Sequence, residues 1–211
     1  MAFDLQEQEQ IDELKAFWRK WGTLITGVLV AAALGTAGVQ GWRWYQHRQA
    51  ESAAALYGQM EALAAKGDTA KLVSAAEPIK QEYPRTAYAA RAALAAARAA
   101  YEANDAKTAR EQLNWVLEHA SEPGLKAVAR LRLATLAVDG KQYDEALGLL
   151  GGEHDTAFDG LFLDAKGDAL AAKGDTAGAR SAYREALNKT PADAPNRSYL
   201  QIKLDALGGE S

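Results

Sequence analysis

The residues best suited to metal binding or nucleophilic chemistry are few and scattered in this 211-residue chain. His47, His119 and His154 lie far apart, and none stands at metal-motif spacing from another histidine. The lack of cysteine excludes disulfides, thiol catalysis and cysteine-ligated metals. The segment "GEHD" at residues 152–155 places two acids beside His154, which is typical of a solvated loop, with a weak cation site as the alternative.

Other catalytic signatures are missing from the sequence as well. It contains no phosphate-binding glycine loop and no nucleophile elbow. We therefore expect neither an enzyme nor a bound cofactor or metal. The net charge is −4, and no basic stripe stands out, so nucleic acid is not an expected partner. A binding function remains, and the elements that would build a binding surface come next.

The N-terminal region contains a run with the length of a membrane span. Residues 21–40, "WGTLITGVLVAAALGTAGVQ", carry no charge. Twenty helical residues cover about 30 Å, the thickness of the hydrocarbon core of a bilayer. Indole rings favour the membrane–water interface, and aromatic residues cluster at both ends of the run: Trp18, Trp21, Trp42, Trp44 and Tyr45. The sequence predicts a leader at 1–20, a transmembrane anchor at 21–41 and a juxtamembrane linker or helix at 42–52.

Two other interpretations of this run stay open. A buried helix of a soluble protein is one, and a cleavable signal peptide ending near Ala31-Ala32-Ala33 is the other. The acidic leader disfavours the signal peptide, since removed signals usually have a short basic one. Three basic residues before the run against two close behind it (Lys15, Arg19, Lys20; Arg43, Arg48) favour an N-terminus inside the cell.

One face of the predicted anchor is lined with small residues. Gly27, Ala31 and Gly35 are spaced by four, so they share a helix face on which another transmembrane helix could pack closely. The alternative is that Ala and Gly are simply frequent in this chain.

The octapeptide "LAAKGDTA" occurs twice, at residues 63–70 and 170–177. Around the second copy, small, aromatic and proline residues have the spacing of the tetratricopeptide pattern of about 34 residues: Gly167, Leu170, Gly174, Ala179, Tyr183, Ala186 and Pro191. Ala146, Ala109 and Leu72 precede Ala179 at successive steps of 33, 37 and 37 residues. An alanine-rich chain of this kind predicts an all-α fold.

We therefore predict a tetratricopeptide-like solenoid over residues 53–207. It should contain four degenerate helix pairs, at 53–86, 87–122, 126–153 and 160–192, and a capping helix at 195–207. The second helix of the third pair should be short or broken, because "GGEHDTAFDG" follows it almost at once.

In such solenoids the first helix of each pair lines a concave face that suits extended peptides. Extending the frame of the last repeat back along the chain predicts nine residues on that face: Tyr57, Glu61, Arg91, Leu94, Arg98, Tyr101, Leu131, Thr135 and Asp164. The alternative is that these are ordinary exposed or inter-helix positions. The Lys/Asn clamp that some such domains use for a C-terminal carboxylate is not recognisable.

The acidic leader, the single span, "GWRWYQHRQ" at 41–49, "DAKGDALAAKGDTAGARSAYREAL" at 164–187 and "LQIKLDAL" at 200–207 together resemble one family. It is the YfgM-like family, the ancillary subunit of the bacterial SecYEG translocon. The resemblance implies a single-pass inner-membrane protein with a cytoplasmic N-terminus and a periplasmic repeat domain. It also implies partnership with the translocon, with a PpiD-like periplasmic chaperone and with unfolded exported polypeptides.

The function implied by this resemblance is that of a tethered adaptor, which helps pass newly exported proteins to periplasmic chaperones. A structural subunit of an inner-membrane complex is the main alternative. An exported repeat protein that is soluble after cleavage, and an enzyme, are the others.

Overall fold

Every regular element in the part of the chain described by the structure, a computed structural model of residues 2–67 and 69–208, is helical. The side chains are described from residue 10 onward. The helices are α1 (Ala2–Ala64), α2 (Thr69–Glu82), α3 (Ala87–Glu102), α4 (Ala106–His119), α5 (Pro123–Asp139), α6 (Tyr143–Leu150), α7 (Asp159–Lys173), α8 (Thr176–Lys189) and α9 (Arg197–Ala206), with a 3₁₀ turn at Thr156–Phe158. The predicted all-α fold is confirmed.

The chain divides into two compact units, the first of which ends at Gln49. The first unit is the N-terminal part of α1, and its apolar side chains face outward, among them Leu24, Val28 and Leu34. Among the described residues, one helical stretch, Gln10–Ala64, is long and apolar enough to cross a membrane. Only 6% of its most apolar window is buried within the protein, which disfavours a soluble core helix.

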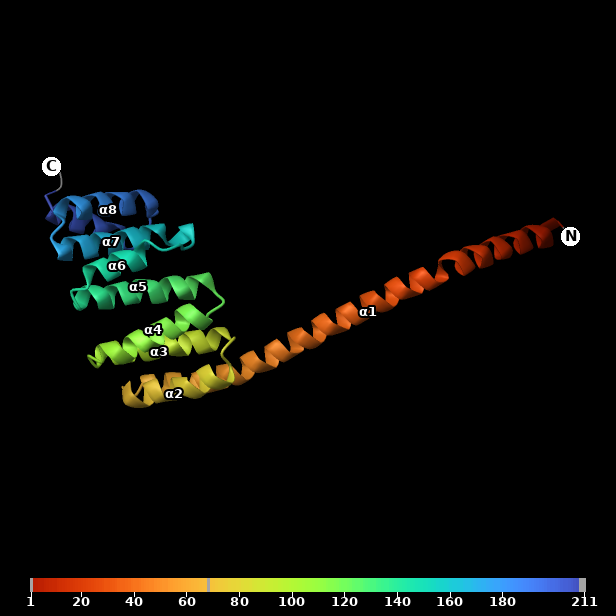
Figure 1. Cartoon of the computed structure of the whole chain (residues 1–211), viewed down its shortest axis with the longest axis horizontal. Helices are drawn as coiled ribbons and strands as arrows, with labels where there is room; N and C mark the ends of the chain where they lie inside the picture. The colour runs from red at the N-terminus through yellow and green to blue at the C-terminus, as the bar shows by residue number, and fades with distance from the viewer. Residues whose placement is uncertain (1, 68, 209–211) are drawn as a thin grey trace. The chain divides into compact units, whose positions relative to one another are not determined.

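The second unit begins at Ala50, so its first helix is the C-terminal part of α1. Figure 1 shows α2 to α8 lying side by side in chain order. Four core clusters join each helix pair to the next: α1 and α2 to α3, α3 and α4 to α5, α5 and α6 to α7, and α7 and α8 to α9. No pair buries its apolar face alone, which is the packing logic of a solenoid.

The turn inside each pair is built in the same way. Its left-handed residue is Gly67, Asn104, Lys141 or Gly174, with φ values of 71°, 62°, 58° and 91°. Aspartate then caps the following helix in two of the pairs: Asp105 accepts from the backbone N–H of Thr108 at 3.0 Å, and Asp175 accepts from that of Gly178 at 2.8 Å. The repeated octapeptide therefore encodes a left-handed turn followed by a helix start.

The last pair shows the closest helix crossing. Gly167 of α7 lies directly against the ring of Tyr183 of α8, so a Cβ atom at this position would overlap the ring. The Tyr183 hydroxyl donates to Asp168 at 2.7 Å. The second helix of the third pair, α6, has only eight residues, as its following glycines predict.

A buried polar network ties α2 to α4. The ammonium group of Lys80, only 9% exposed, pairs with Glu77 at 2.7 Å and donates to the side-chain oxygen of Gln112 at 2.9 Å. Gln112 also donates to Glu77 at 3.1 Å. Burial acts to raise the pKa of Glu77, but the hydrogen bonds from Lys80 and Gln112 outweigh it and lower the pKa overall.

The C-terminal helix α9 covers one face of α7 and α8. Its Leu200 and Leu204 are buried in the last core cluster. Lys203 lies 2.7 Å from the carboxylates of both Asp164 and Asp168. Arg197 donates to the backbone oxygens of Leu187 and Thr190, both at 2.6 Å. Helix α9 thus completes the core of the last pair.

Candidate peptide-binding groove

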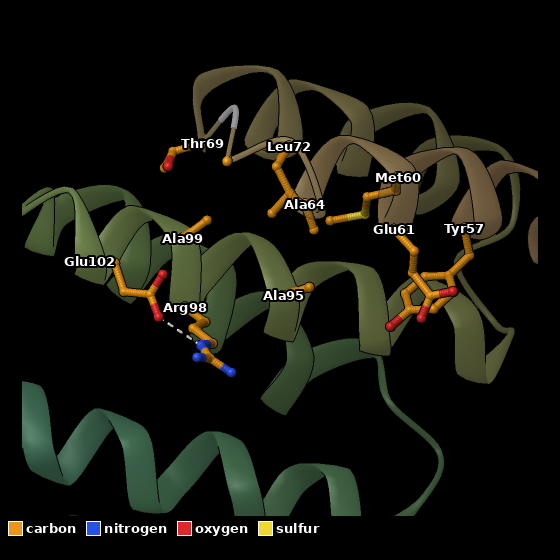
Figure 2. Close-up of a pocket in the computed structure, with 11 residues that line it drawn as sticks. Tyr57, Met60, Glu61, Ala64, Thr69, Leu72, Ala95, Arg98, Ala99 and Glu102 are labelled. Atoms are coloured by element: carbon orange, nitrogen blue, oxygen red, sulfur yellow. Dashed lines mark hydrogen bonds and ion pairs between the residues drawn. The ribbon is translucent and has the colours of Figure 1, made fainter.

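A first pocket opens between the end of α1 and α3, with a volume of about 380 Å³. In Figure 2, Met60 and Leu72 extend toward α3, while Tyr57 and Glu61 stand at one end of the pocket and Thr69 at the other. The full lining is Tyr57, Met60, Glu61, Ala64, Gly67, Thr69, Leu72, Ala95, Arg98, Ala99 and Glu102. The small alanines of α3 leave the space, because larger side chains at these positions would fill it.

A second pocket of about 350 Å³ lies between α3 and α5, over α4. It is lined by Ala97, Arg98, Tyr101, Glu102, Ala109, Leu113, Arg132, Thr135 and Leu136. It shares Arg98 and Glu102 with the first pocket, so the two are neighbours along α3. A third and larger hollow, at the turns that follow α3 and α5, shares Tyr101, Glu102 and Leu136 with the second. We call these three adjoining pockets the groove.

Ion pairs and hydrogen bonds fix several of its side chains. Arg98 pairs with Glu102 at 2.7 Å (Figure 2). The Tyr101 hydroxyl donates to Asp139 at 2.8 Å, and this bond to a carboxylate raises the pKa of Tyr101. Burial raises the pKa of Tyr57, the charge of Glu61 adds to it, and Arg91 opposes it. Tyr57 and Tyr101 therefore remain neutral at ordinary pH.

Five of the nine predicted residues line the first two pockets: Tyr57, Glu61, Arg98, Tyr101 and Thr135. Arg91 lies just outside, with its guanidinium 5.8 Å from the ring centre of Tyr88, and Tyr88 packs on Tyr57. Leu131 is half-buried against the third core cluster. Seven of the nine predicted residues therefore lie in or beside the groove or against a core cluster.

Two of the residues predicted on the concave face are covered by other helices in the structure. Leu94 is only 8% exposed and packs in the core, because α5 covers that face of α3. Asp164 is covered by α9, whose Lys203 neutralises its carboxylate. Burial raises the pKa of Asp164, and the lysine opposes this shift. The last repeat, which gave the clearest pattern in the sequence, thus has its own C-terminal helix on the predicted binding face.

The frame missed Arg132, which lies in the second pocket between the predicted positions Leu131 and Thr135. Its guanidinium donates to the backbone oxygen of Leu94 at 3.0 Å. Burial lowers the pKa of Arg132, and the nearby Arg98 lowers it further. A lone arginine on a helix carries no sequence signal for such a position. Only the packing of α5 on α3 places it there.

His154 has a structural role. His154 stacks on Phe162, with ring centres 3.8 Å apart, and its Nε2 lies 3.3 Å from Asp159. Among the side chains that the structure describes, those of residues 10–67 and 69–208, no cluster of three or more His, Asp or Glu residues could hold a metal ion. On the anchor, a Cβ built at Gly27 or Gly35 would have no described atom within 4 Å, so the helix itself leaves the predicted packing face open.

Comparison with known proteins gives a consistent result over the whole chain. The tetratricopeptide repeat-like domain family matches residues 15–209, which confirms the predicted repeat fold. An ancillary SecYEG translocon subunit of Neisseria gonorrhoeae is 34% identical over 98% of this chain and 100% of its own length. The Escherichia coli protein of the same name is 33% identical over 95% of this chain and 96% of its own. That of Haemophilus influenzae is 31% identical over 88% and 91%.

Proposed function

The chain belongs to the tetratricopeptide repeat-like family of ancillary SecYEG translocon subunits, and on this premise we propose that it is a non-enzymatic, membrane-tethered adaptor of the Sec translocon. In this role its repeat unit binds newly exported proteins and helps pass them to periplasmic chaperones. The partners are the SecYEG translocon, a PpiD-like chaperone and unfolded exported polypeptides.

The groove is the observation that supports client binding. Its lining combines accessible tyrosine and guanidinium groups, those of Tyr57, Tyr101 and Arg98, with the buried side chains of Met60, Leu72 and Leu136. Aromatic and arginine side chains contribute most to peptide recognition in known interfaces. A subunit that only held a complex together would not need the three adjoining pockets of the groove.

The proposed location is the bacterial inner membrane, with residues 21–41 as the single span. The N-terminus lies in the cytoplasm and the repeat unit in the periplasm. The exposed apolar side chains of this stretch support the location, because lipid is the solvent that they match.

Photocrosslinking in native membranes tests the adaptor proposal. A photoreactive residue at Thr135, in the second pocket, should crosslink to an arrested exported polypeptide. The same residue at Asn114 of α4, which is exposed and lies outside the groove, is the matched control and should not. If Thr135 crosslinks only to fixed membrane partners, the alternative of a structural subunit replaces the adaptor.

Cysteine labelling tests the orientation cleanly, because the natural chain has no cysteine. In intact cells, a maleimide that crosses the outer membrane but not the inner membrane should label Ser198→Cys, on the exposed face of α9, and spare Gln10→Cys. The reverse pattern would place the N-terminus in the periplasm and the repeat unit in the cytoplasm. Labelling of both cysteines would contradict a single span.

A further inference from the structure

The charged residues of the groove differ in whether they have a charged partner. Arg98 has Glu102, and Asp139 accepts a hydrogen bond from Tyr101. Arg132 has only a backbone carbonyl, that of Leu94. Among the side chains described from residue 10 onward, no carboxylate lies within ion-pair distance of Arg132.

This position is electrostatically unfavourable for a cation. Arg132 is exposed at the edge of the second pocket, and the other guanidinium that lines this pocket, that of Arg98, is close enough to disfavour its charge. A guanidinium nevertheless stays protonated at any physiological pH. A carboxylate that entered the pocket would relieve this repulsion and would accept charge-assisted hydrogen bonds from the planar guanidinium of Arg132.

We infer that Arg132 is an anion-binding residue of the groove and that its ligand is the side-chain carboxylate of an Asp or Glu in an extended client segment. The inference rests on the proposed function, since it specifies which clients the groove prefers. The second pocket fits such a ligand, with the Arg132 guanidinium as the donor and the buried side chains of Leu113 and Leu136 as the apolar part of the lining.

The first pocket adjoins the second, and it bears on the choice of the test peptides. In an extended chain, residues two apart project to the same side, about 7 Å from each other. The first and second pockets adjoin at Arg98 and Glu102, and the first is lined by Met60, Leu72 and Ala99. Because the two pockets share Arg98 and Glu102, the test peptides carry a leucine two residues from the acidic one.

Binding of two fluorescent peptides to the full chain in detergent micelles tests this inference. Both peptides are extended, neutralised at the C-terminus by amidation, and differ only in carrying Leu-Ser-Glu or Leu-Ser-Gln. The Glu peptide should bind about tenfold more tightly, the scale of a charge-assisted hydrogen bond at a partly exposed site. Arg132→Gln should abolish this difference, and Arg132→Lys should retain part of it.

Arg130→Gln is the matched control, since Arg130 lies on the same helix but donates to the backbone oxygen of Glu153, away from the groove. It should keep the tenfold preference. A third peptide, with Gln and a free C-terminus, tests the other source of a carboxylate and should bind no better than its amidated twin.

The outcomes separate failure of the inference from failure of the proposed function. Equal affinity of the unsubstituted chain for the Glu and Gln peptides overturns the inference and leaves client binding intact. So does a preference that survives in folded Arg132→Gln, or tighter binding gained from a free C-terminus. If the unsubstituted chain binds none of the peptides, the proposed adaptor function falls together with the inference. Circular dichroism of each variant establishes that it is folded.

Discussion

Lys141 occupies the left-handed position in the turn of the third pair, with a φ of 58°. A side chain at such a backbone angle costs roughly 1–2 kcal/mol, whereas glycine adopts it freely. Two of the four turns use glycine, and a third uses Asn104, a residue type that tolerates the left-handed region. Lys141 is exposed and gains no packing in return.

Lys141→Gly should therefore stabilise the repeat unit, despite the greater flexibility of glycine in the unfolded chain. The net gain should be up to about 1 kcal/mol, because the entropy of glycine offsets part of the relieved strain. Thermal melting of the full chain in micelles measures the change. Asn104→Gly is the control and should have a smaller effect. A lower melting temperature for Lys141→Gly would show that the lysine is not strained.

The residues around Lys203 make the last pair sensitive to alkaline pH. Burial acts to lower the pKa of Lys203, but Asp164 and Asp168 outweigh it and raise the pKa above 10.5. Burial, followed by the hydrogen bond to Asp168, raises the pKa of Tyr183 above 10.0. The neighbouring ring of Tyr199 lies 4.9 Å from the ammonium group. A raised pKa means that the folded chain holds the proton more tightly than the unfolded chain.

The stabilisation from both groups is thus fully present below their unfolded pKa values and is lost as the pH rises through the folded ones. Lys203→Met should lower the melting temperature at neutral pH, because it leaves Asp164 buried without its cation. The difference between this variant and the unsubstituted chain should shrink only as the pH rises from about 10.5 through the higher folded pKa of Lys203. A constant difference over that range would contradict the assignment.

Single residues also show what the sequence could not supply. The repeat frame placed Tyr57, Arg98, Tyr101 and Thr135 at the groove because period alone decides which helix face they share. Whether that face is open depends on the neighbouring helix. The packing of α5 buries Leu94 and brings Arg132 into the pocket, and no local pattern encodes either result.

At the scale of elements, α9 closes the last repeat, and its two faces differ sharply. Leu200 is 0% exposed and lies among Ala179, Tyr183 and Ala186, whereas Ile202 is 62% exposed. A solenoid leaves an apolar face open at its end unless a capping element covers it. The apolar pattern of residues 195–207 predicted such an element, and the structure has a helix there from Arg197 to Ala206.

Leu200→Ala should destabilise the last pair by about 2–5 kcal/mol, the range for removing a fully buried leucine. Ile202→Ala, the control on the same helix, should change stability by less than about 0.5 kcal/mol. Hydrogen exchange localises the effect, which should appear in α7, α8 and α9 and spare α3. Uniform loss of protection along all the helices would mean that the repeats unfold as one unit.

The turns show why the repeats were visible at all. Two turns carry Gly followed by an aspartate-containing start, and the identical octapeptide revealed them. The other two use Asn104-Asp105 and Lys141-Gln142, which adopt the same left-handed geometry without a glycine. The spacing predicted these turns, and their composition did not. Left-handed geometry imposed by the packing of the flanking helices has no signature in the sequence.

At the scale of the whole molecule, the two units are built for different solvents. The repeat unit buries its alanines and leucines in four clusters. The first unit leaves nearly all of its apolar side chains exposed, since only 6% of its most apolar window is buried within the protein. The relatives named as translocon subunits align with nearly the full length of the chain, so they share both units. A membrane anchor that is common to such proteins should itself take part in assembly.

The face formed by Gly27, Ala31 and Gly35 is our candidate for that contact. Nothing in the described chain lies within 4 Å of a Cβ built on either glycine, so the face is free to receive another helix. Small residues at a spacing of four let two transmembrane helices approach closely. Because lipid tails are as apolar as the side chains, such helices associate through close packing rather than through the hydrophobic effect. Replacing both glycines with leucine keeps the segment apolar but holds a partner helix away.

We therefore expect Gly27→Leu/Gly35→Leu to remain in the membrane fraction after carbonate extraction and to recover less of the translocon on mild-detergent purification. A several-fold loss is expected, because the leucine side chains would prevent the close approach of a partner helix. Ala33→Leu adds the same kind of bulk on the opposite side of the helix, 100° per residue round the axis, and should leave recovery unchanged. Equal recovery in all three proteins would exclude this face as the site of assembly. Equal loss in both variants would show that the anchor tolerates no added bulk on either side.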